Sequence, residues 1–123
     1  MKIILDTNFL FLPFYEHFDV VLELKKLHPK AEIIILDDVI REVEKLKKEN
    51  VKWAGLAEEY IKIKKVKKAH YGEEISVDEK ILKYAEEHNA FIGTIDKDLK
   101  KKAVSKKIKI ITFLKSKKKL LEQ

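Results

Sequence analysis

The sequence predicts an α/β fold of three layers, in which a central parallel sheet lies between two layers of helices. Short runs of almost wholly apolar, β-branched residues recur along the chain, which is typical of strands buried on both faces of a parallel sheet. Between these runs, apolar residues recur at spacings of three and four, as expected for helices that cover a sheet with one face. Strand and helix alternate, and this alternation favours parallel strands joined by crossover helices.

Four apolar runs are expected to form the strands. The runs KIIL and EIIIL are apolar after their first residue, the run AFIGT is interrupted by Gly93, and the last run is IKIIT. Residues 64–69 fit an exposed edge strand, and their lysines fit a loop equally well. In chain order the expected strands cover residues 2–5, 32–36, 90–94 and 108–112.

Helices are expected wherever the three- and four-residue spacing continues for at least one turn. The clearest run begins at Phe18 and continues through Leu24 to Leu27, and the next contains Val39, Val43 and Leu46. Together the expected helices cover residues 18–27, 39–46, 56–63, 81–85 and 99–104.

Length and composition indicate one domain rather than two. A chain of 123 residues buries a single core. We expect one domain over residues 1–113, followed by a basic, disordered C-terminal tail over residues 114–123. The absence of cysteine excludes disulfides, thiolate metal sites and a cysteine nucleophile. No stretch reaches the ~20 apolar residues of a membrane span, so we expect a cytoplasmic protein without a membrane partner.

The net charge of +6 is concentrated near the C-terminus. Residues 97–123 contain eleven lysines and only two acidic residues, Asp98 and Glu122. A basic segment on a slightly acidic body favours a polyanionic partner, most commonly nucleic acid. The alternative is a solvated lysine-rich surface, because heavy use of Lys and Glu is also typical of proteins from thermophiles.

Acidic residues follow the expected strands at their carboxyl ends. Asp6 follows the first strand, Asp37 and Asp38 follow the second, and Asp96 follows the strand over residues 90–94. The carboxyl ends of parallel strands meet at one edge of a sheet, where ligands bind. Asp78 begins a helix and Glu42 lies one turn beyond Asp38, so both are candidates for the same edge.

Helix capping is the competing explanation for these acids. Ser76 and Glu79 form an S-x-x-E capping box, which makes Asp78 an ordinary first-turn acid, and Asp37 or Asp38 fits a cap. Capping explains Glu42 poorly because it lies beyond the first turn. It also explains Asp6 poorly, because the following Thr and Asn are available to cap.

Several carboxylates at one edge repel one another unless a cation lies between them. Hard oxygen donors suit Mg²⁺ or Mn²⁺. Together with the basic segment, they indicate metal-assisted cleavage of a phosphodiester by a water nucleophile.

The sequence resembles the PIN-domain ribonucleases over nearly its whole length. Their pattern begins with a strand ending in DTN, here IILDTNFL, and continues with a Glu in the helix after the second strand, here DDVIREVEKL. A helix opening on Asp follows, here SVDEKILKYAEEHNA, and then a strand running into an Asp, here FIGTIDKDLKKKA. The wording DTNFLFLPFYEHFDVVLEL looks more like the branch that matures small-subunit ribosomal RNA than the toxins of toxin–antitoxin pairs.

The resemblance implies roles for particular residues. It implies a catalytic set that also binds Mg²⁺ or Mn²⁺: Asp6, Glu42, Asp78 and Asp96, with Asp98 as a further metal ligand. Asn8 and Thr94 correspond to small polar residues that orient carboxylates, and the product would carry a 5′-phosphate. We expect the lysines after Asp96 to bind RNA: Lys97, Lys100, Lys101 and Lys102.

Three alternatives remain beside this hypothesis. A PIN fold also serves as an RNA- or protein-binding module in a ribosome-assembly or surveillance complex, and many PIN proteins form homodimers. A toxin-type ribonuclease is the second alternative. An aspartyl-phosphate phosphatase or a receiver domain would need a second acid after the first strand, where this chain has Asn8.

Overall fold

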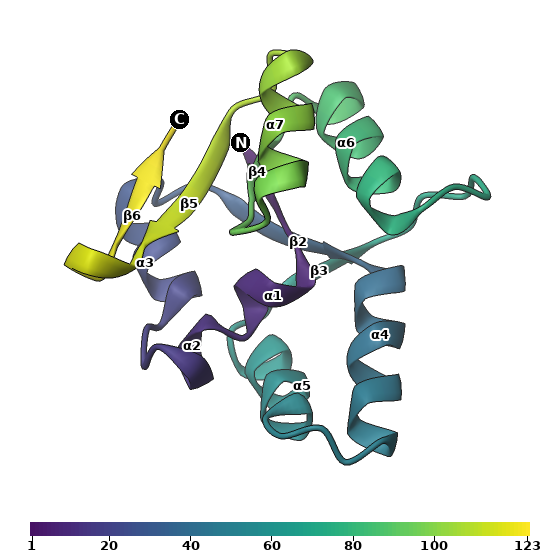
Figure 1. Cartoon of the computed structure of the whole chain (residues 1–123), viewed down its shortest axis with the longest axis vertical. Helices are drawn as coiled ribbons and strands as arrows, with labels where there is room; N and C mark the ends of the chain where they lie inside the picture. Colours follow the sequence, from purple (N-terminus) through teal and green to yellow (C-terminus); the bar gives the residue numbers. More distant parts are fainter.

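The computed structural model describes all residues, 1–123, and contains one six-stranded sheet in the order β3-β2-β1-β4-β5-β6 (Figure 1). Every neighbouring pair is parallel except β5 and β6, which are antiparallel. In chain order the strands are β1 Lys2–Leu5, β2 Glu32–Leu36, β3 Lys67–Ala69, β4 Phe91–Gly93, β5 Ile110–Leu114 and β6 Lys119–Glu122. This mixed but mainly parallel sheet, with its helices, confirms the predicted fold class.

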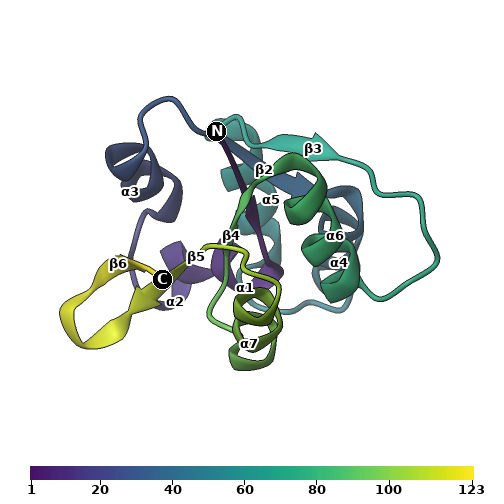
Figure 2. The same ribbon diagram turned by 90° about the horizontal axis from the view of Figure 1, so that it is seen from above.

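Helices cover both faces of the sheet. Helices α6 and α7 lie side by side on one face, and α3 lies on the other (Figure 2). Helices α4 and α5 pack against each other as a pair beyond the end of β2 (Figure 1). The helices are α1 Thr7–Leu10, α2 Leu12–Tyr15, α3 Val20–Leu27, α4 Asp37–Lys48, α5 Ala54–Ile63, α6 Val77–His88 and α7 Lys97–Ser105, with a 3₁₀ turn η1 over Lys115–Lys117.

The core forms on both faces of the two central strands. Ile3, Ile4 and Leu5 of β1 are fully buried, and Ile92 of β4 is buried beside them. Burial on both faces explains why these strands read as continuous apolar runs rather than as alternating ones. A second, smaller cluster holds α2, α4 and α5 together through Phe11, Val43 and Ala57, with Phe14, Leu46 and Trp53 packed against it.

Several elements differ from the sequence prediction in position. Strand β5 begins at Ile110, two residues later than expected, because Ile108 is buried in the loop that follows α7. Helices α1 and α2 have four residues each, so they are too short to produce a periodic pattern. The uncertain stretch over residues 64–69 contains the edge strand β3.

The C-terminal residues, expected to be a disordered basic tail, form ordered structure instead. Strand β6 pairs with β5, and the Ile110 and Gln123 backbones exchange two hydrogen bonds of 3.0 and 2.8 Å. Leu120 packs against the core, which anchors a segment whose lysines alone indicated a tail. No helix of the chain combines the length and the apolar character that crossing a bilayer requires.

Candidate active site

The pairing of β1 with β4 brings two candidate residues together at the carboxyl edge of the sheet. Leu5 lies opposite Gly93, and the Asp6 N–H donates to the Gly93 carbonyl at 3.0 Å. Asp6 and Thr94, each the first residue after its strand, are therefore neighbours although 88 positions separate them. The parallel pairing of β1 with β4 is therefore sufficient to bring Asp6 and Thr94 together.

Asp6 is buried and both of its carboxylate oxygens are hydrogen-bonded. Oδ1 accepts from the Thr7 N–H at 2.7 Å, which caps α1, and Oδ2 accepts from the Thr94 hydroxyl at 3.0 Å. Burial raises the pKa of Asp6, the two hydrogen bonds lower it, and the negative charges of Asp78 and Asp96 raise it further. No positively charged side chain is among the groups that shift the pKa of Asp6.

Thr94 connects Asp6 to Asp96. Its hydroxyl donates to Asp6 and accepts the Asp96 N–H at 3.0 Å, and its side chain is fully buried. Asp96 caps α7, because Oδ1 accepts from the N–H groups of Asp98 and Leu99 at 2.8 and 3.0 Å. Both acids therefore cap helices. The expectation that capping explains Asp6 poorly, because the following Thr and Asn are available to cap, was wrong.

Glu42 reaches the same edge from α4. Its Oε2 accepts a hydrogen bond from the Thr7 hydroxyl at 3.1 Å. The sequence interpretation missed Thr7 as an orienting residue and assigned that role to Asn8, which is exposed and has no side-chain hydrogen bond to an acid. The DTN motif contains the necessary signal, because Thr7 is its middle residue.

Asp78 lies in the first turn of α6, half-buried, and the other acids affect it. Ser76 caps this helix by accepting the Glu79 N–H at 3.2 Å, as the capping box predicts. Burial is the largest cause that raises the pKa of Asp78, the charges of Asp96 and Glu42 add to it, and Lys102 opposes them. The electrostatics therefore link all four predicted catalytic acids.

The four acids fit a divalent cation in chemistry, although no group of three forms a ready-made metal cluster. Their hard oxygen donors repel one another, and burial withholds water from Asp6, so a cation would lower the energy of the charged set. Asp98 is exposed, and the contact it makes with the set is a hydrogen bond from its backbone N–H.

The predicted RNA-binding lysines divide between two sides of α7. Lys102 faces α6, where its Nζ lies 3.9 Å from Glu79 Oε1, and it is the lysine that acts on Asp78. The others line a shallow hollow with Gln123 on the opposite side of the helix, and the Lys100 Nζ lies 3.5 Å from the Thr112 hydroxyl. These are Lys97, Lys100 and Lys101.

The chain is similar to several known proteins. Ribonuclease VapC4 of Methanocaldococcus jannaschii is 36% identical to this chain, and the match covers 89% of this chain and 88% of that protein. The structure of the PIN domain endonuclease Utp24 matches with a TM-score of 0.82 and 24% identity over 99% of this chain and 90% of the other. A domain of a functionally unknown protein from Methanocaldococcus jannaschii matches with a TM-score of 0.65 and 22% identity, over 92% and 91%.

These two structural matches show the fold, and the family model adds the sequence pattern. The model of a PIN like domain matches residues 3–117, a range that contains all four predicted catalytic acids. The chain belongs to the PIN-like domain family.

Proposed function

We propose that this protein is an endoribonuclease that hydrolyses phosphodiester bonds of single-stranded RNA with the help of Mg²⁺ or Mn²⁺. One observation carries the proposal. The Thr94 hydroxyl holds Asp6 beside Asp96 at the carboxyl edge of the sheet, and the charges of Asp96 and Glu42 raise the pKa of Asp78. The family membership and the similarity to Ribonuclease VapC4 support it.

Each acid has its own part in the proposed mechanism. Asp6, Asp78 and Asp96 hold the cation, and Glu42 either binds it too or orients the attacking water. Asp98 stays a candidate outer ligand. The cation would supply a lowered pKa of the nucleophilic water and neutralisation of the phosphate charge as the bond breaks, leaving a 5′-phosphate.

The surrounding residues of the chain fix the orientation of these groups. Thr94 holds one Asp6 oxygen and Thr7 holds one Glu42 oxygen, so both carboxylates keep a single direction. Burial of Asp6 keeps bulk water from competing for its oxygens. Lys102, beside Asp78, is placed to contact a phosphate of the RNA, and such contacts position the strand without reading its sequence.

Two versions of the proposal differ in the RNA that is cut. The DTNFLFLPFYEHFDVVLEL segment supports maturation of small-subunit ribosomal RNA, with a ribosome-assembly partner. The 36% identity to Ribonuclease VapC4 favours the toxin-type version. Incubation with a small-subunit ribosomal RNA precursor and with total transfer RNA, followed by end mapping, separates the two.

The test of the proposal is cleavage of a short end-labelled single-stranded RNA with Mn²⁺, with Mg²⁺ and with EDTA. We expect cleavage that needs the metal and leaves 5′-phosphates. Asp6→Asn should abolish it, because the amide keeps nearly the same shape as the carboxylate but lacks the negative charge that holds the cation. Full activity of Asp6→Asn would overturn the assignment.

Helix α4 offers a matched pair of variants. Glu42→Gln should reduce cleavage by about 10²-fold or more, the scale expected for loss of an oriented catalytic group. Glu44→Gln, two residues along the same helix on an exposed side chain with no ion pair, should leave cleavage unchanged. Metal-independent RNA binding with no cleavage in any condition would instead support the binding module.

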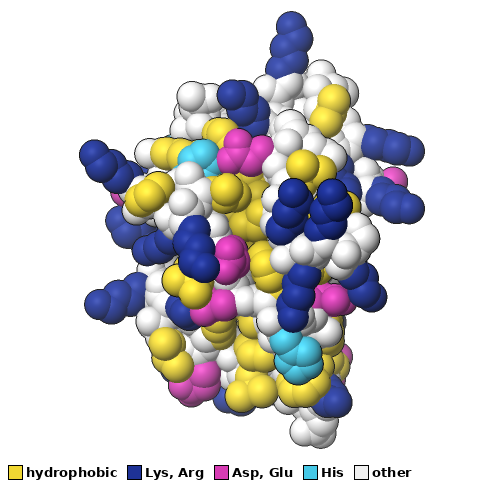
Figure 3. Space-filling model, turned by 90° about the vertical axis from the view of Figure 1, so that its left-hand side faces the viewer, with side chains coloured by type: hydrophobic (Ala, Val, Ile, Leu, Met, Phe, Trp, Pro, Cys, Tyr) yellow, Lys and Arg dark blue, Asp and Glu magenta, His cyan; other side chains and the backbone are white.

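One surface is relevant to a partner chain. The face formed by α3 and β6 carries exposed hydrophobic side chains among lysines (Figure 3), including Leu22, Leu27 and Leu121. This face is the candidate surface for the proposed homodimer. Sedimentation equilibrium of the wild-type protein and of Leu22→Asp tests it.

A further inference from the structure

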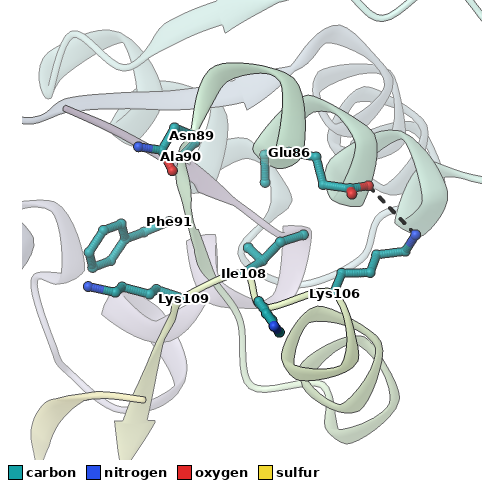
Figure 4. A pocket seen from close by; sticks show the side chains of 9 residues that line it. Glu86, Asn89, Ala90, Phe91, Lys106, Ile108 and Lys109 are labelled. Carbon is teal, nitrogen blue, oxygen red and sulfur yellow. Dashed lines mark ion pairs between the residues drawn. The ribbon is translucent and has the colours of Figure 1, made fainter.

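A hollow of about 370 Å³ lies at the amino-terminal ends of β4 and β5, at the edge of the sheet opposite the acids (Figure 4). It is bordered by the end of α6 and by the loop that joins α7 to β5. Ile108 lies between two groups of side chains, Phe91 with Lys109 and Glu86 with Lys106 (Figure 4). The volume of the hollow falls within the ~300–1,000 Å³ range of small-ligand pockets.

The charges around this hollow favour an anionic ligand. Three lysines line it, against a single acid. Glu86 already pairs with Lys106 at 3.6 Å, whereas Lys107 and Lys109 have no ion pair. The Lys109 Nζ lies 5.8 Å from the centre of the Phe91 ring, so it borders the apolar part of the hollow.

The remaining lining fits a flat, uncharged group. The half-buried Phe91 forms the aromatic part of the lining, the buried Ala85, Ala90 and Ile108 add a small apolar surface, and Asn89 contributes an amide at the end of α6. An apolar, partly aromatic surface beside unpaired cations is the combination that binds a nucleobase together with its phosphate. Inorganic phosphate alone would leave the apolar surface unused.

The location connects this hollow with the acidic edge. Helices α6 and α7 both begin at the acids, with Asp78 and Asp96, and both end at the hollow. Helix α7 has nine residues, so it spans about 13 Å, a distance that a few nucleotides of a single strand cover. One RNA strand can therefore reach both places.

We infer that the hollow binds one nucleotide of the single-stranded RNA, with Lys107 and Lys109 contacting its phosphate and Phe91 and Ile108 contacting its base. The inference rests on the proposed function for RNA as the ligand, but it does not require cleavage. The bound nucleotide is remote from the cut and anchors the strand along α6 and α7.

The experiment measures binding of a fluorescently labelled single-stranded RNA by anisotropy, in EDTA, over a range of salt concentrations. The test variant is Lys107→Gln/Lys109→Gln. The matched control is Lys62→Gln/Lys65→Gln at the end of α5, because it removes the same charge from exposed lysines without ion pairs. Each pair contains one residue in the left-handed conformation, Lys107 with φ 59° and Lys65 with φ 56°.

Loss of the contact with this one phosphate should lower the slope of log K against log salt by about 0.7, which corresponds to about 5-fold weaker binding at 0.1 M salt. The control should change both quantities much less. Equal changes in the two variants would overturn the inference, because charge alone would then explain them.

A second measurement distinguishes a nucleotide from a bare anion. Adenosine 5′-monophosphate should shift the NMR signals of Phe91, Asn89 and Ile108, and equimolar inorganic phosphate should shift them much less. Equal shifts, or none, would contradict a nucleotide site. Because neither experiment involves cleavage, an inactive protein that passes both would refute the nuclease proposal and leave this site standing.

Discussion

Replacing Gly93 by alanine should destabilise the sheet next to the site. A Cβ atom at this position would lie 2.7 Å from Leu5 Cδ2 and 2.9 Å from Phe9 Cε2, closer than carbon atoms pack. Both neighbours are fully buried, so neither moves without displacing others. Leu5 immediately precedes Asp6, whose N–H binds the Gly93 carbonyl, so the displacement also reaches the carboxylate.

The expected magnitude is the balance of two effects. Overpacking a filled core costs about 1–3 kcal/mol. Replacing glycine gains about 0.4–1 kcal/mol by restricting the unfolded chain. The net loss in free energy of unfolding is therefore about 1–2 kcal/mol, and Phe9→Leu should relieve part of it by removing the ring atoms that the new Cβ meets.

The assay is urea unfolding followed by circular dichroism for Gly93→Ala, Phe9→Leu and the double variant. We expect the double variant to be about 1 kcal/mol more stable than the sum of the single effects, because the two changes share one contact. Additive losses, or a Gly93→Ala protein more stable than wild type, would refute this account of the packing between β1, β4 and α1.

Three further outcomes follow from side-chain contacts. Asp38→Ala should cost about 3 kcal/mol of stability in urea unfolding. The Asp38 carboxylate lies 2.8 Å from the Lys80 ammonium and both side chains are more than four-fifths buried, so the substitution leaves a buried ammonium without its partner. Replacing both residues by apolar ones should cost less. Thr94→Val should cost about 1–3 kcal/mol and reduce cleavage, whereas Thr94→Ser should retain both properties through its hydroxyl, and a stable, active valine variant would contradict the bridging role. The hydrogen bond from a histidine ring holds the pKa of Asp37 at about 2, below the ~3.9 of an unfolded chain, so this carboxylate stabilises the fold above about pH 4 and the effect is lost as pH falls towards 2. The contribution should stay below about 1 kcal/mol because the pair is partly exposed, and thermal unfolding of Asp37→Asn across pH 2–6 should lack this pH dependence.

The central part of the fold was predictable because the strands around it are buried on both faces. The runs that form β1 and β2 are apolar without interruption after their first residue, so they show neither a helical nor an alternating pattern. Asp6 follows the carboxyl end of β1, so the sequence alone predicts its place at that edge of the sheet. Family membership confirms the PIN resemblance that was stated from the motifs. The individual roles of the acids stay predictions, supported by the electrostatic linkage among them.

Other features depend on tertiary contacts that a sequence pattern lacks. Strand β6 forms because β5 offers an unpaired edge and the core accepts Leu120, so a lysine-rich segment that reads as a tail is ordered. The division of the lysines between two sides of α7 follows from which helix face the core covers, through Leu99 and Ala103. The orienting role of Thr7 required knowing that α4 passes close to α1.

The central claim is that acids from four separate segments form one cation-binding site. The most direct measurement is Mn²⁺ binding to the RNA-free protein by isothermal titration calorimetry, for wild type, for the acid variants Asp6→Asn, Asp78→Asn and Asp96→Asn, and for Glu44→Gln as a control. The account predicts that each acid variant weakens Mn²⁺ binding by at least about tenfold while Glu44→Gln binds as wild type does. Unchanged Mn²⁺ affinity in the three acid variants would contradict it.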